Sequence, residues 1–440
     1  MNFTKLRPFL LIFPFLFLGC DEEPEITAVP EEVEWIKANA YRPTSVDPTN
    51  TNFEDLQFLK TVIGDRRLVM LGEQSHGDGT TFSAKVRLIK FLHKEMGFDI
   101  IAWESSFYEC HKSWLGMKSG KNGIQVAKKS INTLWSDTEE VHPLFDYMDD
   151  APYSLELMGV NPQFYGSYDV EIADDLEAFL QSRNSATVDA PNWAGNKSML
   201  VNLLKAEDNP AGNGETFLNN ASALIESLVS EITTFDQTPQ IELMNDAGFW
   251  LQVLYNVKMT TEIHQMWRVP ELNYNGHAIR HEVMASNLSW IMDRYPERKV
   301  IVWAATTHIS RYWDDVIYFD RTSKDYVNTF PTSKHMGEYI YEKYGDDMYA
   351  VGFTAYQGSF FSFGDGFRKI DKPDDDSLED YLNQTDEEYL FINYRGNLPD
   401  WMKGVFVSTV YGYNNAKNDW INSLDGIFYT RNMEASHFRP

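Results

Sequence analysis

The chain has 440 residues, of which 43% are hydrophobic and 14% aromatic, and its formal net charge at pH 7 is −27. This length and apolar content predict a globular protein with a large core, in one large domain or two smaller ones, and they exclude a disordered chain. The negative charge predicts that the protein does not bind nucleic acid, because it would repel a phosphate backbone.

Residues 1–20 have the composition of a targeting segment. Lys5 and Arg7 precede an apolar run from Phe9 to Leu18, which is too short to anchor stably across a bilayer. The run ends in Phe17-Leu18-Gly19-Cys20, which resembles a bacterial lipobox, so we expect cleavage before Cys20 and lipidation of its thiol. The alternative is an ordinary secretory signal with a chance cysteine. We therefore expect a lipoprotein signal peptide over 1–20, a tether and an N-terminal helix over 21–48, and a domain that the lipid anchor holds at the membrane of the cell envelope, outside the cytoplasm.

Short apolar runs alternate with helical patterns over residues 49–167. The spacing of apolar residues predicts helices over 52–63 and 82–96. Uninterrupted apolar runs predict buried strands over 68–71, 98–103 and 155–160. We interpret residues 49–167 as the first part of an α/β domain.

The pattern changes at residue 168. Helical stretches cover about 168–184, 197–206, 215–234 and 239–268. We interpret residues 168–268 as a helical insertion that packs over the C-terminal edge of the sheet. Residues 269–440, the second part of the α/β domain, begin with a helix over 276–295 and continue with strands over 299–304, 348–353 and 426–430. Together these elements predict an α/β fold with a mostly parallel central sheet flanked by helices.

Polar side chains follow each of the first four predicted strands. In chain order they are Glu73 and His76, then Glu104, then Asn161, and finally Thr306, Thr307 and His308. Because the carboxyl ends of parallel strands lie at one edge of a sheet, we expect these side chains to line one cleft. Two imidazoles and two carboxylates in a cleft are typical of catalysis by proton transfer.

The Glu73–His76 pair lies just before a predicted helix that begins near Thr81. The partial positive charge at that helix N-terminus predicts that His76 stays neutral, the form that accepts a proton. Glu73 is expected to fix the tautomer of His76 through the other ring nitrogen.

Arg280 opens the helix over 276–295 and is expected to approach the same cleft, where a guanidinium binds an anionic group or an oxyanion. A surface arginine is the alternative. His277 and His281 are four residues apart and could clamp a metal, but no third ligand has a recognisable spacing, so we expect no metal or other cofactor. We expect Cys110 to be a small buried side chain and not a nucleophile.

Several motifs, taken together, resemble those of the erythromycin esterase family. Leu71-Gly72-Glu73-Gln74-Ser75-His76-Gly77 resembles its Gly-Glu-x-x-His-Gly signature, and Glu104 matches its second acidic position. Arg280 with Met284-Ala285 resembles its Arg…Met-Ala helix. Val302-Trp303-Ala304-Ala305-Thr306-Thr307-His308 resembles its Trp-Ala-His-Asn-Ala-His stretch. The similarity runs in order from about residue 50 to about residue 435.

The resemblance implies an α/β hydrolase of a distinct fold, with a helical subdomain, that opens a lactone by adding water without an obligatory metal. Carried over, it implies that His76 activates water beside Glu73 and Glu104, and that Arg280 and His308 bind or polarise the ester. The substrate is then a small-molecule ester or lactone, with macrolides as one candidate, and we expect it to contact Asn161, Thr306 and Thr307. The chain departs from the family motifs at Ala305, Thr306, Asn161 and His281, which leaves this core intact but alters its surroundings.

Two other hypotheses stay open on the sequence alone. One is a metal-dependent hydrolase, since distantly related Gly-Glu-x-x-His proteins resemble metalloproteases. The other is a non-catalytic surface lipoprotein that uses the cleft to capture haem or an envelope component. Loss of activity on chelation would favour the first hypothesis, and tight binding without turnover of any ester would favour the second.

Overall fold

The computed structural model describes residues 29–150, 155–204, 214–320, 322–328, 333–362 and 364–439. The predicted signal peptide, Cys20 and the first part of the predicted tether lie outside these residues. The described chain begins with α1 (Glu31–Asn39), in the region where a helix was predicted. No helix in the described ranges is long and apolar enough to cross a membrane.

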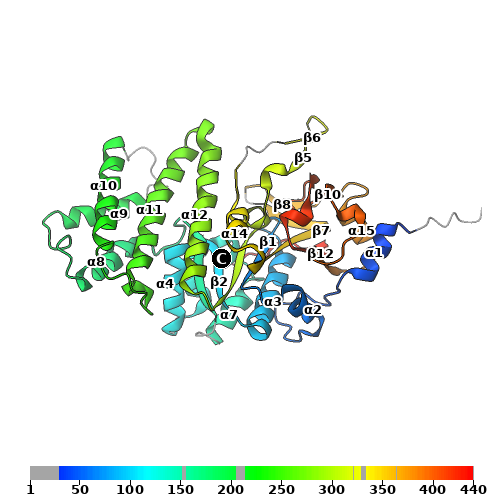
Figure 1. Cartoon of the computed structure of the whole chain (residues 1–440), viewed down its shortest axis with the longest axis horizontal. Helices are drawn as coiled ribbons and strands as arrows, with labels where there is room; N and C mark the ends of the chain where they lie inside the picture. The colour runs from blue at the N-terminus through cyan, green and yellow to red at the C-terminus, as the bar shows by residue number, and fades with distance from the viewer. Residues whose placement is uncertain are drawn as a thin grey trace, which may run out of the picture.

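An eight-stranded sheet forms the centre of the molecule (Figure 1). Its strands, in spatial order, are β3 (Glu156–Asn161), β2 (Phe98–Ser106), β4 (Lys299–Ala305), β1 (Leu68–Glu73), β7 (Met348–Ser362), β12 (Gly426–Met433) and β9 (Tyr389–Asn393), and β8 (Gly366–Lys369) pairs with β7. All pairs from β3 to β12 are parallel, whereas β9 and β8 run antiparallel to their neighbours. The predicted α/β class is therefore confirmed, and β1 to β4 end at one edge of the sheet.

Both faces of the sheet are buried. In β1, Leu68 and Met70 belong to one hydrophobic core, and Val69 and Leu71 belong to another on the opposite face. Because successive side chains of a strand point to opposite faces, such a strand must be apolar at every position, which explains its uninterrupted apolar run.

Helices cover each of these faces. The core that contains Val69 and Leu71 includes α2 (Phe58–Ile63), α3 (Gly79–Met96) and α7 (His142–Asp150). The opposite core includes α12 (Asn273–Arg294), α14 (Met336–Tyr344) and α15 (Leu378–Asn383). The shorter connecting helices are α4 (Phe107–Lys118), α5 (Gly123–Ala127), α6 (Thr133–Ser136), α13 (Thr306–Ile309) and α16 (Trp420–Ser423).

Four further helices form a layer at one end of the molecule, beyond the edge strand β3 (Figure 1). They are α8 (Ile172–Ser182), α9 (Trp193–Leu204), α10 (Glu215–Ile232) and α11 (Ala247–Trp267). The last of them packs against α12, which in turn packs on β3. The Thr260 hydroxyl on α11 donates to the carbonyl of Pro162, 2.9 Å away, so the layer also contacts the loop at the C-terminal end of β3.

Several boundaries differ from the predictions. α11 begins at Ala247 and not near residue 239, because the Asp246 side chain caps it by accepting from the Phe249 N–H at 2.9 Å. β7 continues to Ser362, well beyond Phe353. A second, antiparallel sheet was not predicted, and its strands in order are β10 (Phe406–Ser408), β11 (Ala416–Asn418), β5 (Ile317–Asp320) and β6 (Asp325–Val327).

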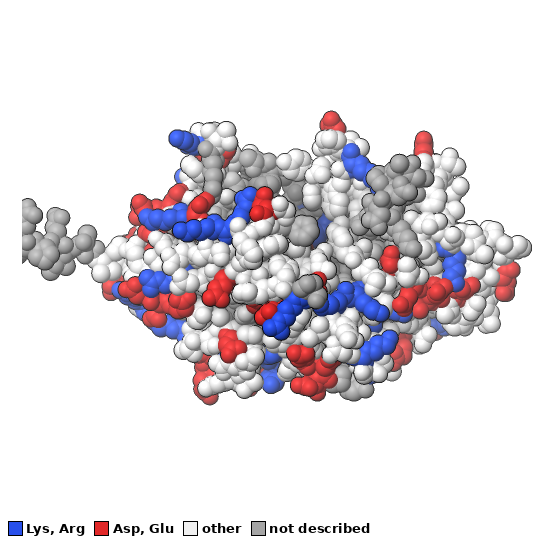
Figure 2. All heavy atoms as spheres, turned by 180° about the vertical axis from the view of Figure 1, so that it is seen from behind, with Lys and Arg blue, Asp and Glu red and all other residues white. Residues whose placement is uncertain are grey.

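The surface carries many charges of both signs. The chain has 65 Asp and Glu and 38 Lys and Arg, and Figure 2 shows the two kinds interspersed over the face turned away in Figure 1. A net charge far from zero, as in this chain, favours solubility.

Candidate active site

The loop between β1 and α3 is held in place by backbone contacts. The carbonyl of Gly77 accepts from the N–H groups of Phe361 at 3.1 Å and Ser436 at 2.9 Å. A Cβ atom on Gly77 would lie 1.9 Å from the Phe361 carbonyl oxygen, so only glycine fits here. Asp78, whose pKa burial raises to about 7, accepts from the Ser75 N–H at 2.9 Å and precedes the first turn of α3.

Glu73, the last residue of β1, is fully buried and holds three donors. Its Oε1 lies 3.2 Å from His76 Nδ1 and 3.0 Å from Trp135 Nε1, and its Oε2 accepts from Lys85 Nζ. Burial disfavours the charged carboxylate, but Lys85 and His76 lower the pKa of Glu73 below its ordinary value. Glu73 is therefore an ionised carboxylate in the protein interior.

Lys85 is the residue that the sequence analysis missed. It lies on α3, is fully buried, donates to the carbonyl of Ala304 at 3.2 Å, and its Nζ lies 4.2 Å from the centre of the Trp303 ring. Burial lowers the pKa of Lys85, although Glu73 opposes that shift. The sequence offered little indication that Lys85 is buried, because α3 carries several basic residues, which usually lie on a solvent-exposed helix face.

His76 is about one-third exposed, at 34% of its side-chain surface, and meets Trp135 edge to face with ring centres 4.8 Å apart. Burial lowers the pKa of His76, but the Glu73 hydrogen bond and the charges of Glu104 and Glu73 raise it above its ordinary value. The prediction that the helix N-terminus keeps His76 neutral is therefore wrong in direction, since the carboxylates outweigh the helix.

A second cluster surrounds Glu104, near the C-terminal end of β2. Its Oε1 lies 2.8 Å from Arg280 Nη2 and 2.8 Å from His308 Nε2, and its Oε2 accepts from the Ala305 N–H at 3.0 Å. Burial opposes the charge, yet His308, His76 and Arg280 hold the pKa of Glu104 well below its usual range. Burial lowers the pKa of His308 despite the nearby carboxylate.

Arg280 connects this cluster to Asn161. Its Nε donates to Asn161 Oδ1 at 3.0 Å, and its Nη1 lies 3.2 Å from His308 Nε2. Only 13% of the arginine side chain is exposed. The alternative of a surface arginine on a helix is therefore wrong.

One peptide unit joins the two clusters. The carbonyl of Ala304 accepts from Lys85, and the N–H of Ala305, at the other end of the same peptide bond, donates to Glu104. The end of β4 thus fixes the Glu73 group and the Glu104 group relative to each other.

The two predicted substrate-binding threonines lie directly after β4. The buried Thr306 hydroxyl donates to the Gly72 carbonyl at 2.6 Å, so it is engaged with the backbone of β1. The carbonyl of Thr307 accepts from His335 Nδ1 at 2.5 Å, and the Thr307 side chain is partly exposed. Contact of either side chain with a substrate stays a prediction.

His277 and His281 face different neighbours. His281 Nδ1 accepts from the Met336 N–H at 3.3 Å and its ring stacks on His335 at 3.8 Å, whereas His277 lies 5.1 Å from the Trp267 ring. Within the described ranges, no three His, Cys, Asp or Glu side chains are grouped so that they could hold a metal ion. Cys110 is buried, which raises the pKa of its thiol well above the ordinary value.

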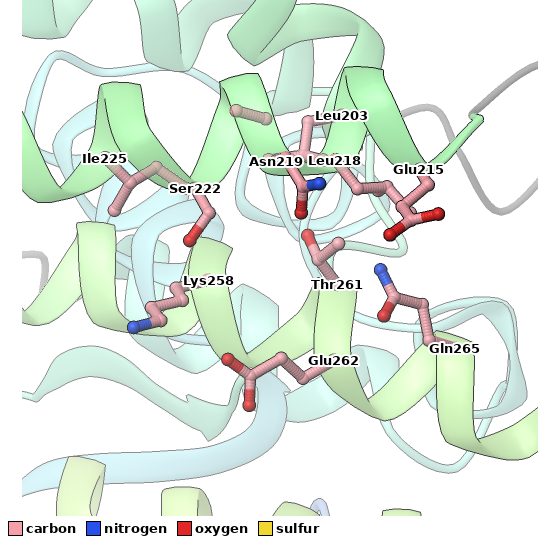
Figure 3. Close-up of a pocket in the computed structure, with 11 residues that line it drawn as sticks. Leu203, Glu215, Leu218, Asn219, Ser222, Ile225, Lys258, Thr261, Glu262 and Gln265 are labelled. Atoms are coloured by element: carbon pink, nitrogen blue, oxygen red, sulfur yellow. The ribbon is translucent and has the colours of Figure 1, made fainter.

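The helical layer contains a cavity of about 460 Å³ that is separate from these clusters. Figure 3 shows Asn219 and Ser222 of α10 facing Lys258 and Thr261 of α11 across it. None of the residues predicted to act in catalysis lines this cavity.

Taken together, the site holds two buried carboxylates, each matched by a cation, and a histidine with one ring nitrogen fixed and a third of its side chain exposed. Such a site can take a proton from water and stabilise a developing negative charge nearby.

Comparisons with known proteins show which family the chain resembles. Residues 93–430 match the family model described as Erythromycin esterase. The chain is 25% identical to the putative hydrolase YbfO of Bacillus subtilis (strain 168), over 91% of both chains. It is 22% identical to an erythromycin esterase type II of Escherichia coli, over 92% of this chain and 98% of that one. The solved structure of a mutant of erythromycin esterase EreC in its open conformation matches with a TM-score of 0.68 and 14% identity, over 91% of this chain and 99% of that one.

Proposed function

The chain belongs to the erythromycin esterase family of hydrolases, and we propose that it cleaves an ester or lactone bond with water that His76 activates as a general base. The observation that carries this proposal is the contact of His76 Nδ1 with the buried carboxylate of Glu73. The ionised Glu73 accepts a hydrogen bond, so Nδ1 of His76 carries the proton. The neutral ring then has its lone pair on Nε2, which can accept a proton from water.

In the proposed reaction, His76 Nε2 takes a proton from water as the oxygen attacks the carbonyl carbon of the ester. A tetrahedral oxyanion forms, and the C–O bond to the alcohol then breaks. The proton on His76 passes to the departing alkoxide, which completes the hydrolysis. Glu73 stabilises the imidazolium of the intermediate, and Lys85 keeps Glu73 ionised.

Arg280 and His308 are the proposed electrophilic side of the site. Arg280 carries a permanent charge, and both side chains are oriented by the same oxygen of Glu104. Groups positioned before the reaction stabilise an oxyanion without reorganising, which is worth about 3–4 kcal/mol for one good donor.

Purified protein that lacks residues 1–20 tests this function against aryl esters and macrolides. We expect turnover of at least one ester, and a loss of about 100-fold or more in kcat for His76→Ala, since general-base catalysis contributes on that order. Equal turnover by the wild type and His76→Ala would contradict the role of His76. Macrolides are included because one relative is named for erythromycin. Activity that chelation abolishes and a divalent ion restores would instead favour the metal-dependent alternative.

We further propose that lipidation of Cys20 tethers this hydrolase to a membrane of the cell envelope. The support is the sequence of residues 1–20, in which basic residues precede an apolar run that ends in Phe17-Leu18-Gly19-Cys20. In cell fractionation the full chain should partition with membranes, and Cys20→Ser should not. Membrane partition of Cys20→Ser would contradict the anchor without affecting the proposed reaction.

A further inference from the structure

Trp135 contacts both members of the Glu73–His76 pair, and the reaction proposed above gives it no role. It lies on α6, its side chain is buried, and its Nε1 donates to Glu73 Oε1 at 3.0 Å. The same oxygen lies 3.2 Å from His76 Nδ1, so the indole and the imidazole share one acceptor. The two rings also meet edge to face, with centres 4.8 Å apart and planes at 76°. Trp135 therefore touches the imidazole directly and also acts on it through the shared oxygen.

The indole helps to fix the direction in which the imidazole points. Lys85 Nζ contacts Oε2 of Glu73 and Trp135 Nε1 contacts Oε1, so each oxygen of the carboxylate has its own donor. A carboxylate held at both oxygens cannot turn to offer His76 a different one. Perpendicular ring pairs are favourable only within a range of orientations, so the ring contact also opposes rotation of the imidazole. Together these contacts keep Nδ1 directed at Glu73 and leave Nε2 on the opposite side of the ring.

Backbone hydrogen bonds hold α6 and the loop between β1 and α3 in one frame. After α6, the Glu139 N–H donates to the His437 carbonyl at 2.8 Å. The neighbouring Ser436 N–H donates to the carbonyl of Gly77, in the loop that follows β1, at 2.9 Å. Two consecutive residues of the C-terminal segment thus link both parts of the chain, so Trp135 lies at a fixed position relative to that loop.

Resting on the proposed role of His76 as the base, we propose that Trp135 is a positioning residue that orients the imidazole and limits how strongly Glu73 binds it. The indole N–H occupies part of the accepting capacity of Glu73 Oε1, so this oxygen is a weaker acceptor for His76. Without that N–H, Glu73 would stabilise the imidazolium more strongly relative to the neutral ring. The indole therefore favours the neutral form, which is the form that takes a proton from water.

Other charged groups also act on His76, and a change at Trp135 leaves them in place. They are Glu73 of β1, Asp78 of the following loop, Lys85 of α3, Glu104 of β2, Arg280 of α12 and His308 of α13. Among them, Glu73 and Glu104 raise the pKa of His76, whereas Arg280 lowers it. Since none of these charges is removed with the indole, a shifted pKa of His76 in a Trp135 variant reports the lost hydrogen bond.

NMR titration of the His76 ring tests this proposal without relying on turnover, and the signal is identified by its absence in His76→Ala. Trp135→Phe keeps an aromatic ring beside His76 but has no N–H. We expect it to raise the pKa of His76 by about 0.5–1 unit, because a donor to a charged acceptor is lost. The acid limb of kcat/KM should move upward by the same amount. KM for an aryl acetate should stay unchanged, since the buried Trp135 does not reach the substrate.

Trp103→Phe is the matched control. Trp103 is buried in the same hydrophobic core, and its ring centre lies 6.4 Å from that of Trp135. Among the described residues, its Nε1 has no hydrogen-bond partner. Both substitutions remove the same group of atoms from one core, so a purely structural role of Trp135 predicts the same effect for both. We expect Trp103→Phe to leave the pKa of His76 unchanged.

A measurement on the wild type keeps the test independent of how the variants fold. Because Trp135 and His76 donate to one oxygen, an indole N–H signal should titrate with the midpoint of His76. Absence of such a signal would overturn the proposal, and so would an unchanged pKa of His76 in Trp135→Phe or an equal shift in Trp103→Phe. A shift specific to Trp135→Phe without turnover of any ester would support the contact and contradict the proposed function. Turnover with an unchanged pKa would contradict the role of Trp135 alone, so the two failures are distinguishable.

Discussion

Lys85 is a cation that the protein interior tolerates because a carboxylate, a carbonyl and an aromatic face surround it. Glu73 and the Ala304 carbonyl accept hydrogen bonds from its ammonium group, which also lies over the Trp303 ring. A buried ion pair is a poor source of stability compared with apolar packing, but removal of one partner is strongly unfavourable. The pair is therefore better explained by what Glu73 does for His76 than by its contribution to folding.

Replacement of Lys85 by methionine leaves the Glu73 charge buried without its counter-ion. We expect Lys85→Met to lower the free energy of unfolding by about 3–5 kcal/mol in urea titrations. Lys60→Met is the control, since the Lys60–Glu95 pair is exposed to solvent and its loss should change the free energy of unfolding little. Addition of Glu73→Gln to Lys85→Met should restore part of the loss. If Lys85→Met alone were as stable as Lys60→Met, Glu73 would not be charged in the folded protein.

The pH profile of kcat/KM provides a second residue-scale prediction. His76 acts as a base only when it is neutral, so kcat/KM rises as the pH rises through its pKa. Because Glu73 and Glu104 raise the pKa of His76, the midpoint of the acid limb should lie above 6.5. In Glu73→Gln one of these charges is lost, and the midpoint should move to lower pH. A midpoint that does not move would assign the acid limb to another group.

At the scale of elements, the loop between β1 and α3 depends on the extension of β7. The Phe361 N–H donates to Gly77, and the two backbones are too close for a side chain. β7 must continue beyond its pairing with β1, as far as its pairing with β8, to make this contact. The position of His76 is therefore set by a strand whose residues come almost three hundred positions later in the chain.

Gly77→Ala tests that dependence. The added methyl would meet the Phe361 carbonyl oxygen at 1.9 Å, so the loop must shift. We expect a loss of about 100-fold in kcat/KM, as for other misplacements of about 1 Å near reacting groups. Gly195→Ala in α9 is the control, because nothing lies within 4 Å of the added Cβ, and it should be neutral or slightly stabilising in thermal unfolding. Full activity in Gly77→Ala would contradict the close contact.

The elements that the sequence predicted well are those with a simple burial pattern. The strands near residues 68–71 and 299–304 are buried on both faces and read as apolar runs, and α8 to α10 have regular apolar spacing. The second sheet was missed because its strands have three or four residues and are partly exposed. The extension of β7 was missed because it depends on pairing with β8 and β12, which the local sequence does not reveal.

The residues of the candidate site that lie at strand ends were predictable from the sequence, whereas the others were not. Glu73 and Glu104 lie near the C-terminal ends of β1 and β2, and His308 follows β4, so the rule for parallel sheets brings them to one edge. The rule for strand ends does not apply to Lys85, because Lys85 lies in the middle of a helix. Its burial becomes evident only when the structure places it beside Glu73. The raised pKa of His76 was missed for a related reason, since it depends on Glu104 from another strand.

At the scale of the molecule, the helical layer and one face of the sheet share a single hydrophobic core. This core includes Leu176, Leu203 and Trp250 of the layer together with Val160 of β3 and Val302 of β4. Continuous apolar packing couples the layer to the sheet, so we expect the two parts to unfold together.

Trp250→Ala tests this coupling. Trp250 is fully buried, and truncation of such a side chain costs about 3–5 kcal/mol. We expect this loss to lower the temperature of a single unfolding transition. Circular dichroism and loss of hydrolysis should report that transition at the same temperature. Ile241→Ala, at a residue that is 96% exposed, should move it little. A separate early transition of the layer alone would show that the two parts are independent.

The segment over 434–439 has a consequence for synthesis of the protein. Ser436 donates to Gly77, Glu434 accepts from Thr80, and Arg439 donates to Asp137. These bonds link the region around His76 to residues that leave the ribosome more than 350 positions after it. The nascent chain therefore lacks a complete site until residues 434–439 have left the ribosome, and we expect the proposed hydrolase to be inactive before that point.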